Sequence, residues 1–272
     1  MVDIHCHVLP DVDDGPKRIE DSLGMLRNAS KAGVEIIVAT PHRFWGPFNV
    51  EVTVRDQLVN DLQNAATKNN IDIQIKPGYE CYLLPEIYEQ DDRLVELTIN
   101  KNGRYILTEL PMHNIPFYAE TVILALMDRG IIPVIAHPER NMAIAKNPNI
   151  LLNYLLKGCI AQLNTGSVLG YYGKTIQETA RILLQHNLVH LVASDMHSIT
   201  SSPMSKAFPV VGTLVGLEKA SDMFNLVPRR VVMGEDFDKD EPLPYEPKRK
   251  SLIDILFRRK SEPKVTDNRE QD

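Results

Sequence analysis

The sequence predicts an α/β protein that folds as a distorted seven-stranded (β/α)7 barrel of the TIM type. Seven short runs rich in β-branched residues recur along the chain, and segments with helical periodicity separate them. This alternation is typical of parallel strands connected by helices. A length of 272 residues, of which 43% are hydrophobic, fits a single domain of this kind. An open doubly wound sheet, built from the same alternation, is the alternative.

The elements of this barrel follow one another along the chain. We expect strands over residues 2–4, 35–39, 71–75, 104–107, 132–136, 159–163 and 188–193. Apolar residues spaced three or four apart predict the helices between them. These positions are Ile19, Leu23 and Leu26 before Gly33, then Val54, Leu58 and Leu62, with similar patterns over 122–127 and 176–184.

The barrel is expected to span residues 1–236. Residues 237–247 contain a polar run and three prolines, a composition typical of a linker. Beyond the linker, residues 248–260 carry six basic residues and one acidic residue around a short apolar run. We therefore divide residues 237–272 into a linker, a short basic amphipathic segment and a disordered tail. Residues 248–260 are candidates for peripheral contact with an anionic membrane or a membrane-bound partner, and a solvated basic extension is the alternative.

Composition excludes several other classes of protein. A net charge of −6 does not favour nucleic-acid binding. The amino terminus lacks the pattern of a signal peptide, and no apolar run approaches the length of a membrane span. We therefore expect a cytoplasmic protein, and association with a membrane through a partner is left open.

The three cysteines do not predict a cysteine-based site. Cys6, Cys81 and Cys159 form no CxxC pair, which argues against a disulfide framework and a structural zinc module. None of them begins the Cys-x5-Arg loop that a cysteine-dependent phosphatase needs. That mechanism is excluded.

Metal-ligand residues follow six of the seven predicted strands. Because the carboxyl ends of barrel strands open on one face, side chains that are distant in sequence should converge there. Two residues spaced two apart on a strand point the same way, so His-x-His and Asp-x-His can each place both side chains on one ion. Nitrogen and oxygen ligands without thiolate suit manganese, iron, cobalt or zinc. The residues are His5, His7, His42, Glu80, Glu109, His137, Asp195 and His197.

Single motifs of this type are weak, and the joint pattern carries the prediction of a metal site. A lone His42 or Glu109 would more often be a satisfied polar group at the end of a strand. The remaining histidines, His113, His186 and His190, are expected to be structural or exposed, with His113 a candidate for the rim of the site.

The motifs resemble those of the polymerase and histidinol phosphatase (PHP) superfamily. The paired histidines near the amino terminus, a second-strand histidine, a glutamate, a fifth-strand histidine and a final Asp-x-His occur in the order of that superfamily. The segments 1–15, 39–42, 133–141 and 192–197 are closer still to the manganese-dependent tyrosine-protein phosphatases of Gram-positive capsule and exopolysaccharide loci, the CpsB/YwqE family. The resemblance covers about residues 1–236 and implies the PHP barrel.

The resemblance also implies three bound divalent ions, and manganese is the expected metal. The first ion would be held by His5, His7, Glu80 and Asp195, the second by Glu80, Glu109 and His137, and the third by Asp14, His42 and His197. Asp14 enters only through the resemblance, since an Asp-Asp-Gly sequence is usually just a turn.

Catalysis is expected to involve Arg140, His42 and Asp195. Metal-activated water would attack phosphorus without a covalent enzyme intermediate. The forked guanidinium of Arg140 could clamp the phosphoryl oxygens, whereas an ion pair with Glu139 is the alternative. Family members carry an arginine a few residues after the Asp-x-His, but residues 198–205 contain none, and Arg43 is a candidate replacement.

The leading hypothesis is a protein-tyrosine phosphatase that regulates capsular or exopolysaccharide synthesis. Its expected substrate is a phosphotyrosine protein, namely a membrane-associated bacterial tyrosine kinase or a substrate of that kinase. A small-molecule phosphatase such as histidinol phosphatase is the alternative enzyme. A non-catalytic adaptor of a polysaccharide assembly complex is the alternative outside enzymes, and a homo-oligomer is left open.

Overall fold

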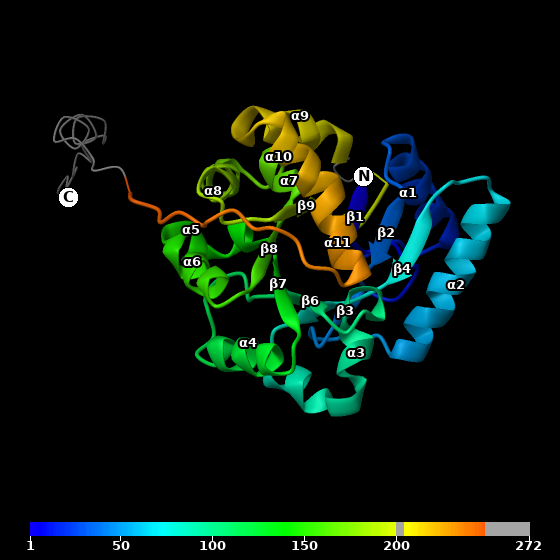
Figure 1. Ribbon diagram of the computed structural model, residues 1–272. Helices are drawn as coiled ribbons and strands as arrows, with labels where there is room; N and C mark the ends of the chain where they lie inside the picture. Colours follow the sequence, from blue (N-terminus) through cyan, green and yellow to red (C-terminus); the bar gives the residue numbers. More distant parts are fainter. Residues whose placement is uncertain (200–203, 248–272) are drawn as a thin grey trace, which may run out of the picture.

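A computed structural model describes residues 1–199 and 204–247, which form a ring of parallel strands surrounded by helices (Figure 1). Within these residues the strands pair in two sheets, ordered β1-β2-β4 and β3-β5-β6-β7-β8-β9, and every pair is parallel. The strands are β1 Val2–Cys6, β2 Ile36–Ala39, β3 His42–Arg43, β4 Gln74–Pro77, β5 Glu80–Tyr82, β6 Tyr105–Glu109, β7 Ile132–Ala136, β8 Ile160–Asn164 and β9 Leu191–Ala193.

Four of these short strands are two interrupted longer ones. Strand β2 continues into β3 after two residues, and β4 continues into β5 in the same way. The backbone N–H of Gly78 donates to the Ala39 carbonyl, and that of Glu80 donates to the Pro41 carbonyl, so the ladder runs across both breaks. Counted this way the described residues contain the seven strands that the sequence predicts.

The first and last strands meet beyond the ends of the two sheets. Asp195 N–H donates to the His5 carbonyl at 2.9 Å, and His7 N–H donates to the Met196 carbonyl at 2.9 Å. A bridge between Cys6 and Met196 lies between these two bonds. The strands therefore follow one another around a distorted barrel, and the first-choice fold class is confirmed.

Two apolar cores lie on the two sides of the strands, and successive strand residues alternate between them. Residues such as Val38, Leu107 and Val134 point into the barrel, where helix α11 (Val227–Met233) closes one end with Val231 and Val232. The intervening residues pack outward against the surrounding helices. Most strand residues are buried, so the strands are largely apolar away from the carboxyl end of the barrel, with the exposed Gln74 in β4 and the buried Asp3 in β1 as exceptions.

A shift of register in β1 places both histidines of the His-x-His motif toward the interior. Asp3 pairs with Ile37 and Cys6 pairs with Ala39, so one extra residue is accommodated in β1. Ile4 belongs to the inner core, whereas Cys6 packs in the outer one. The irregularity therefore reverses the alternation, and the side chains of His5 and His7 face the barrel interior.

The helices surround the strands, and those over 19–31, 52–68, 119–128 and 174–185 lie where the periodicity predicts them (Figure 1). They are α1 Ile19–Lys31, α2 Val52–Lys68, α3 Leu94–Leu97, α4 Ala119–Asp128, α5 Met142–Lys146, α6 Asn149–Leu156, α7 Thr165–Val168, α8 Lys174–Gln185, α9 Met204–Val215 and α10 Leu217–Ser221, with 3-10 turns at Pro85–Arg93, Ile99–Lys101 and Pro138–Arg140 and a π-helical turn at Asp222–Leu226.

Three local predictions need correction. Helix α2 does not bury Val54, which is 46% exposed, but buries Arg55 instead. Arg55 lies 4.4 Å above the ring of Tyr79 and donates to the Glu96 carbonyl, so a cation is satisfied in the core. The third strand pairs from Gln74 and the seventh begins at Leu191, each three residues later than expected.

Residues 237–247, predicted as a linker, lie extended along the outside of the barrel (Figure 1). Leu243 N–H donates to the His186 carbonyl, and Tyr245 exchanges hydrogen bonds with the side chain of Asn149. The basic segment 248–260 lies outside the described residues. Within residues 1–199 and 204–247, no helix has both the length and the apolar character needed to cross a bilayer.

Candidate metal centre

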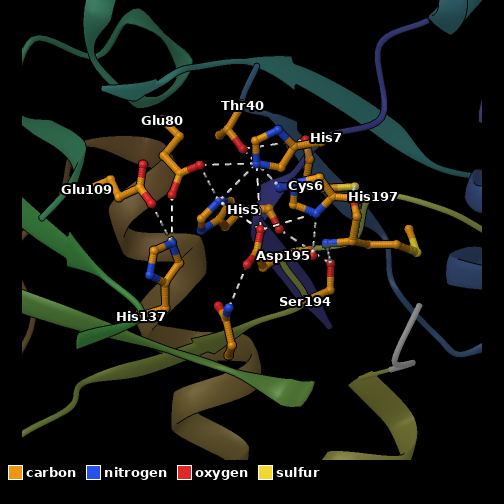
Figure 2. A network of polar contacts seen from close by, with 12 residues as sticks. His5, Cys6, His7, Thr40, Glu80, Glu109, His137, Ser194, Asp195 and His197 are labelled. Atoms are coloured by element: carbon orange, nitrogen blue, oxygen red, sulfur yellow. Dashed lines mark hydrogen bonds and ion pairs between the residues drawn. The ribbon is translucent and has the colours of Figure 1, made fainter. Parts of the chain in front are cut away.

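All nine predicted ligand residues converge at the carboxyl end of the barrel strands. Figure 2 labels those other than Asp14 and His42. Their ligand atoms form four overlapping groups in which every atom lies within 4.8 Å of the others. Seven of the nine residues are buried, so the cluster lies largely inside the barrel mouth. The groups are His7, Asp14, His42 and His197; His5, His7 and Glu80; His5, His137 and Asp195; and His42, Glu80 and Glu109.

The innermost group has the spacing of ligands around one ion. His5 Nε2 lies 3.3 Å from His7 Nε2, 3.3 Å from Glu80 Oε2 and 3.3 Å from Asp195 Oδ1. His7 Nε2 lies 3.2 Å from Glu80 Oε2 and 3.6 Å from Asp195 Oδ1. An ion bound at about 2.1 Å holds neighbouring ligand atoms roughly 3 to 3.5 Å apart, so the atoms of His5, His7 and Glu80 fit one divalent cation. Asp195 lies close to both histidines but groups with His5 and His137 instead.

Glu80 connects this group to its neighbours. Its Oε2 atom also lies 3.2 Å from His42 Nδ1, and its Oε1 atom lies 2.8 Å from His137 Nε2. Glu109 Oε1 lies farther away, 3.9 Å from His137 Nε2. Glu80 is therefore placed to bridge adjacent ions, as the ligand assignment from the resemblance requires.

A third group opens toward solvent. Asp14 Oδ1 lies 3.5 Å from His42 Nε2 and 3.3 Å from His197 Nε2. The side chains of Asp14 and His197 are 44% and 30% exposed, whereas that of His42 is 6% exposed. Substrate would therefore reach the centre from the side of Asp14 and His197.

Unsatisfied atoms support the fit to metal. In the described part of the chain, buried side-chain atoms without a hydrogen bond include His42 Nδ1, Glu109 Oε2 and Asp195 Oδ1, all three in this centre. His42 Nδ1 and Asp195 Oδ1 have ion-pair contacts to Glu80 and His5 but no hydrogen bond, and a cation would satisfy all three atoms. The donor set and its spacing thus suit divalent ions, while ligation itself stays a prediction.

The pKa values of the ligand residues in the protein without metal also favour binding of cations. Burial lowers the pKa of His5, but the carboxylates of Glu80 and Asp195 outweigh burial and raise it to about 9. Burial likewise opposes the charge of Glu80, yet the surrounding histidines hold its pKa well below the usual range. Protonated histidines therefore neutralise the carboxylates, a role that metal ions would take over on binding.

Glu109 behaves differently from the other carboxylates. Burial and the negative charge of Glu80 raise the pKa of Glu109 to about 9. At neutral pH its carboxyl group holds a proton, which a cation would displace. In the protein without metal, the positive charge around Glu109 is too small to keep its carboxyl group ionised.

Three polar residues that the sequence reasoning missed orient the ligands. Asp13 Oδ2 lies 2.8 Å from His7 Nδ1, and Gln162 Oε1 lies 2.9 Å from His5 Nδ1. The Gln162 amide donates to Asn164 Oδ1, and the Asn164 amide donates to Asp195 Oδ2 at 2.6 Å. Such contacts fix the ring orientation of metal-bound histidines and strengthen them as ligands.

Backbone strain marks two of the predicted ligands. His137 has φ of 31° and Asp195 has φ of 51°, values that side chains other than glycine rarely adopt. His137 directly follows β7 and Asp195 comes two residues after β9, where the chain leaves the barrel. Strain of this type gathers at functional sites, because the surrounding fold holds it in place.

Arg140 lies at the rim and contacts the cluster directly. Its Nη1 atom donates to Asp195 Oδ2 at 2.9 Å, and its guanidinium lies 5.0 Å from the centre of the Tyr172 ring. Its predicted alternative partner, Glu139, instead accepts from the Ser167 hydroxyl and the Asn164 N–H. Arg140 therefore lies against the predicted ligand Asp195, and its role in binding phosphate stays a prediction.

The other candidates lie outside the ligand groups. Arg43 donates to the carbonyls of Asn49 and Val50 and to the Glu51 carboxylate, so the structure does not support it as a replacement for the family arginine. His113 is exposed and contacts Met142. His186 and His190 bond to the backbone of Ile182 and Ala161, respectively.

Comparison with known proteins identifies the family. The family model described as capsular polysaccharide synthesis, CpsB/CapC, matches residues 1–233. The chain belongs to this family. The resemblance predicted from the motifs is thereby confirmed, and the matched region contains all nine predicted ligands of the CpsB/CapC centre.

Named relatives in the CpsB/CapC family are tyrosine-protein phosphatases. The chain is 39% identical to tyrosine-protein phosphatase YwqE of Bacillus subtilis over 199 residues, which is 73% of this chain and 78% of that protein. It is 34% identical to tyrosine-protein phosphatase CpsB of Streptococcus pneumoniae over 242 residues, which is 86% of this chain and 99% of that protein.

Solved structures agree with this family assignment. A crystal structure from work on YwqE of Bacillus subtilis and CpsB of Streptococcus pneumoniae, described as metal-dependent tyrosine phosphatases, matches with a TM-score of 0.85 and 33% identity over 91% of this chain and 100% of the other. A histidinol phosphate phosphatase of Lactococcus lactis matches with a TM-score of 0.52 and 18% identity over 80% and 93% of the two chains. The second likeness shows a shared fold alone.

Proposed function

We propose that the protein is a metal-dependent protein-tyrosine phosphatase that acts in capsular or exopolysaccharide synthesis. The observation that carries the proposal is the position of Glu80, whose two carboxylate oxygens contact His5, His7 and His42 on one side and His137 on the other. A carboxylate shared in this way suits adjacent divalent ions, which are well adapted to hydrolysis of phosphate esters. The relatives named as tyrosine phosphatases support the choice of ester.

The residues of the chain have distinct roles in this reaction. When bound, the ions supply Lewis acidity that activates water and stabilises charge on the phosphoryl group. Arg140, already 2.9 Å from Asp195, would hold a phosphoryl oxygen at the rim with its planar guanidinium. Asp195 contacts both His5 and His197, and His42 contacts both Glu80 and Asp14, so each of these two catalytic candidates connects buried ligands to the more exposed ones.

The finer features follow from the family resemblance. We propose manganese as the ion, three ions as the full complement, and a membrane-associated tyrosine kinase or its target as the phosphoprotein. A cytoplasmic location, contact of residues 248–260 with a membrane and a homo-oligomer also stay predictions. Metal analysis of the purified protein and a pull-down of kinase with full-length and truncated chains would test them separately.

The central experiment measures phosphate release from a phosphotyrosyl peptide. We expect activity that chelator abolishes and manganese restores, and we expect His5→Ala and Asp195→Ala to lose nearly all of it. His113→Ala is the matched control, because His113 is an exposed histidine outside the ligand groups. Full activity in His5→Ala, or activity that survives metal removal, would contradict the proposal.

The alternative functions are separated by substrate. A histidinol phosphatase should hydrolyse histidinol phosphate in preference to the peptide, and the present support for it is a shared fold alone. An adaptor without catalysis should release no phosphate from either substrate after metal loading. The nine converging ligand residues argue against the adaptor, because binding to a partner does not require them.

A further inference from the structure

The turn between β3 and α2 places two aromatic side chains beside the metal centre. Trp45 and Phe48 exchange both backbone hydrogen bonds across Gly46 and Pro47, at 3.1 and 2.9 Å. Gly46 has φ of 53°, which favours glycine at that position of the turn. The turn is thus a defined structure, in which the two aromatic residues are paired with each other through their backbones.

Arg43 fixes this turn from below. Its Nη1 atom donates to the carbonyls of Asn49 and Val50 at 3.2 and 2.8 Å, and the Asn49 side chain accepts from Phe44 N–H. Arg43 is 7% exposed and directly follows the predicted ligand His42. The base of the turn is therefore tied to the strand that carries a ligand.

The two aromatic rings stack against each other and against His42. The Trp45 ring lies 4.5 Å from the His42 ring at 25°, and the Phe48 ring lies 6.1 Å from it at 15°. Trp45 and Phe48 are themselves 5.6 Å apart and inclined by 12°. Because the three separations are similar and the planes nearly parallel, the rings form an offset stack rather than a straight column of three. We call this pair the aromatic shelf.

The shelf adjoins the open side of the centre. His42 Nε2 lies 3.5 Å from Asp14 Oδ1, and Asp14 is the most exposed of the candidate ligands. Trp45 and Phe48 are only partly buried. An ester whose phosphate is held at the ions would extend its organic group past this edge.

We propose that the aromatic shelf is the subsite for the aryl group of the substrate and makes the centre select phosphate esters of phenols. This inference rests on the proposed function and deepens it. An aromatic ring placed against Trp45 and Phe48 gains stacking beyond the burial of its area, which an aliphatic group of the same size does not. Selection for tyrosine then comes from this turn, while the ions act on the phosphate common to all esters.

Binding of two phosphonates to the metal-loaded protein tests the proposal without turnover. Phenylphosphonate and cyclohexylphosphonate match in charge and size, and only the first is aromatic. Trp45 is the single tryptophan of the chain, so its fluorescence reports on the shelf directly. With zinc loaded, we expect phenylphosphonate to bind about three- to tenfold more tightly and to change the emission more strongly.

Variants separate recognition from support of His42. Phe48→Leu keeps apolar volume and the fluorescent reporter, and Trp45→Leu is followed by calorimetry. We expect both to bring the affinity ratio of the two phosphonates close to one while metal content stays that of the wild type. Phe117→Leu is the control, because Phe117 is a 98% exposed aromatic residue outside the turn.

Three outcomes would overturn the inference. They are equal affinity of the wild type for the two phosphonates, an unchanged ratio in both variants, and an equal loss of both ligands together with metal. The last would show that the shelf only holds His42 in place. The proposed function fails independently, when a protein that binds phenylphosphonate selectively releases no phosphate from the phosphotyrosyl peptide.

Discussion

Asp13 and His7 form a buried pair in which Asp13 Oδ2 lies 2.8 Å from His7 Nδ1, on the side of the ring opposite the predicted metal. The same Asp13 oxygen accepts from the backbone N–H of His42 at 3.2 Å, and Oδ1 accepts from Gly15 N–H. One carboxylate therefore sets the orientation of His7 and the position of the strand that carries His42. It also favours the His7 tautomer whose Nε2 lone pair faces the centre.

Replacing Asp13 should weaken metal binding although Asp13 is not a predicted ligand. We expect Asp13→Ala to lower metal affinity by about ten- to hundredfold, because His7 loses the group that orients it. Asp13→Asn should lose less, since the amide oxygen can still accept from His7. Competition with a chromogenic chelator measures the affinities. Asp11→Asn, an exposed neighbour, is the control, and wild-type affinity in Asp13→Ala would refute the role.

Most of the fold and the ligand set could be predicted from the sequence, because each rests on a local pattern. The alternation of β-branched and helical segments gave the seven strands, and ligand residues after strand ends gave the position of the centre. The resemblance added Asp14, which the structure places 3.3 Å from His197. These inferences did not require any knowledge of side-chain packing.

The residues that orient the ligands were not predicted, because their positions depend on packing that local sequence patterns do not encode. Asp13 and Asp14 are adjacent, and the sequence alone does not say which of them turns inward. Gln162 and Asn164 left a clearer signal, since two polar residues alternate in the otherwise apolar strand β8. Polar side chains pointing into an apolar barrel interior need partners, so this strand indicated a polar layer beside the ligands.

The register shift in β1 and the buried Arg55 were beyond sequence reasoning. The shift becomes visible only through the pairing of β1 with β2. Arg55 is buried because Tyr79, Asp56 and Glu96 surround its guanidinium, whereas periodicity of apolar residues favoured Val54. Tertiary contacts outweighed the local pattern in both cases.

Glu80→Gln should disrupt the whole centre rather than a single position. The amide keeps the shape of Glu80 but removes the charge that faces His5, His7 and His137. We expect loss of more than one ion per chain and at least about a hundredfold lower phosphate release. Plasma emission analysis gives the metal content. Glu89→Gln, on the surface, is the control, and a variant with full metal content and full activity would contradict the bridging role.

Arg140→Lys should reduce stabilisation of the transition state while leaving the metal content unchanged. Lysine keeps the charge near Asp195 but loses the planar fork that matches a phosphoryl group. We expect kcat/KM for a phosphotyrosyl peptide to fall by about ten- to hundredfold. Arg181→Lys, an exposed arginine on α8, serves as the control. Loss of metal in Arg140→Lys would show instead that Arg140 acts by holding Asp195.

His190 should make the fold less stable in mild acid. Burial, then the charges of Lys239 and Lys219, lower its pKa to about 3, whereas an unfolded histidine titrates near pH 6.5. Between these values the unfolded chain binds a proton that the folded one excludes, so stability falls as the pH drops below about 6.5. Urea unfolding, with chelator in every sample, measures the free energy of unfolding. Between pH 7 and 5 we expect this free energy to fall by about 2 kcal/mol less in His190→Gln than in the wild type. From pH 8 to 7 both proteins should change alike, and equal acid sensitivity would refute the assignment.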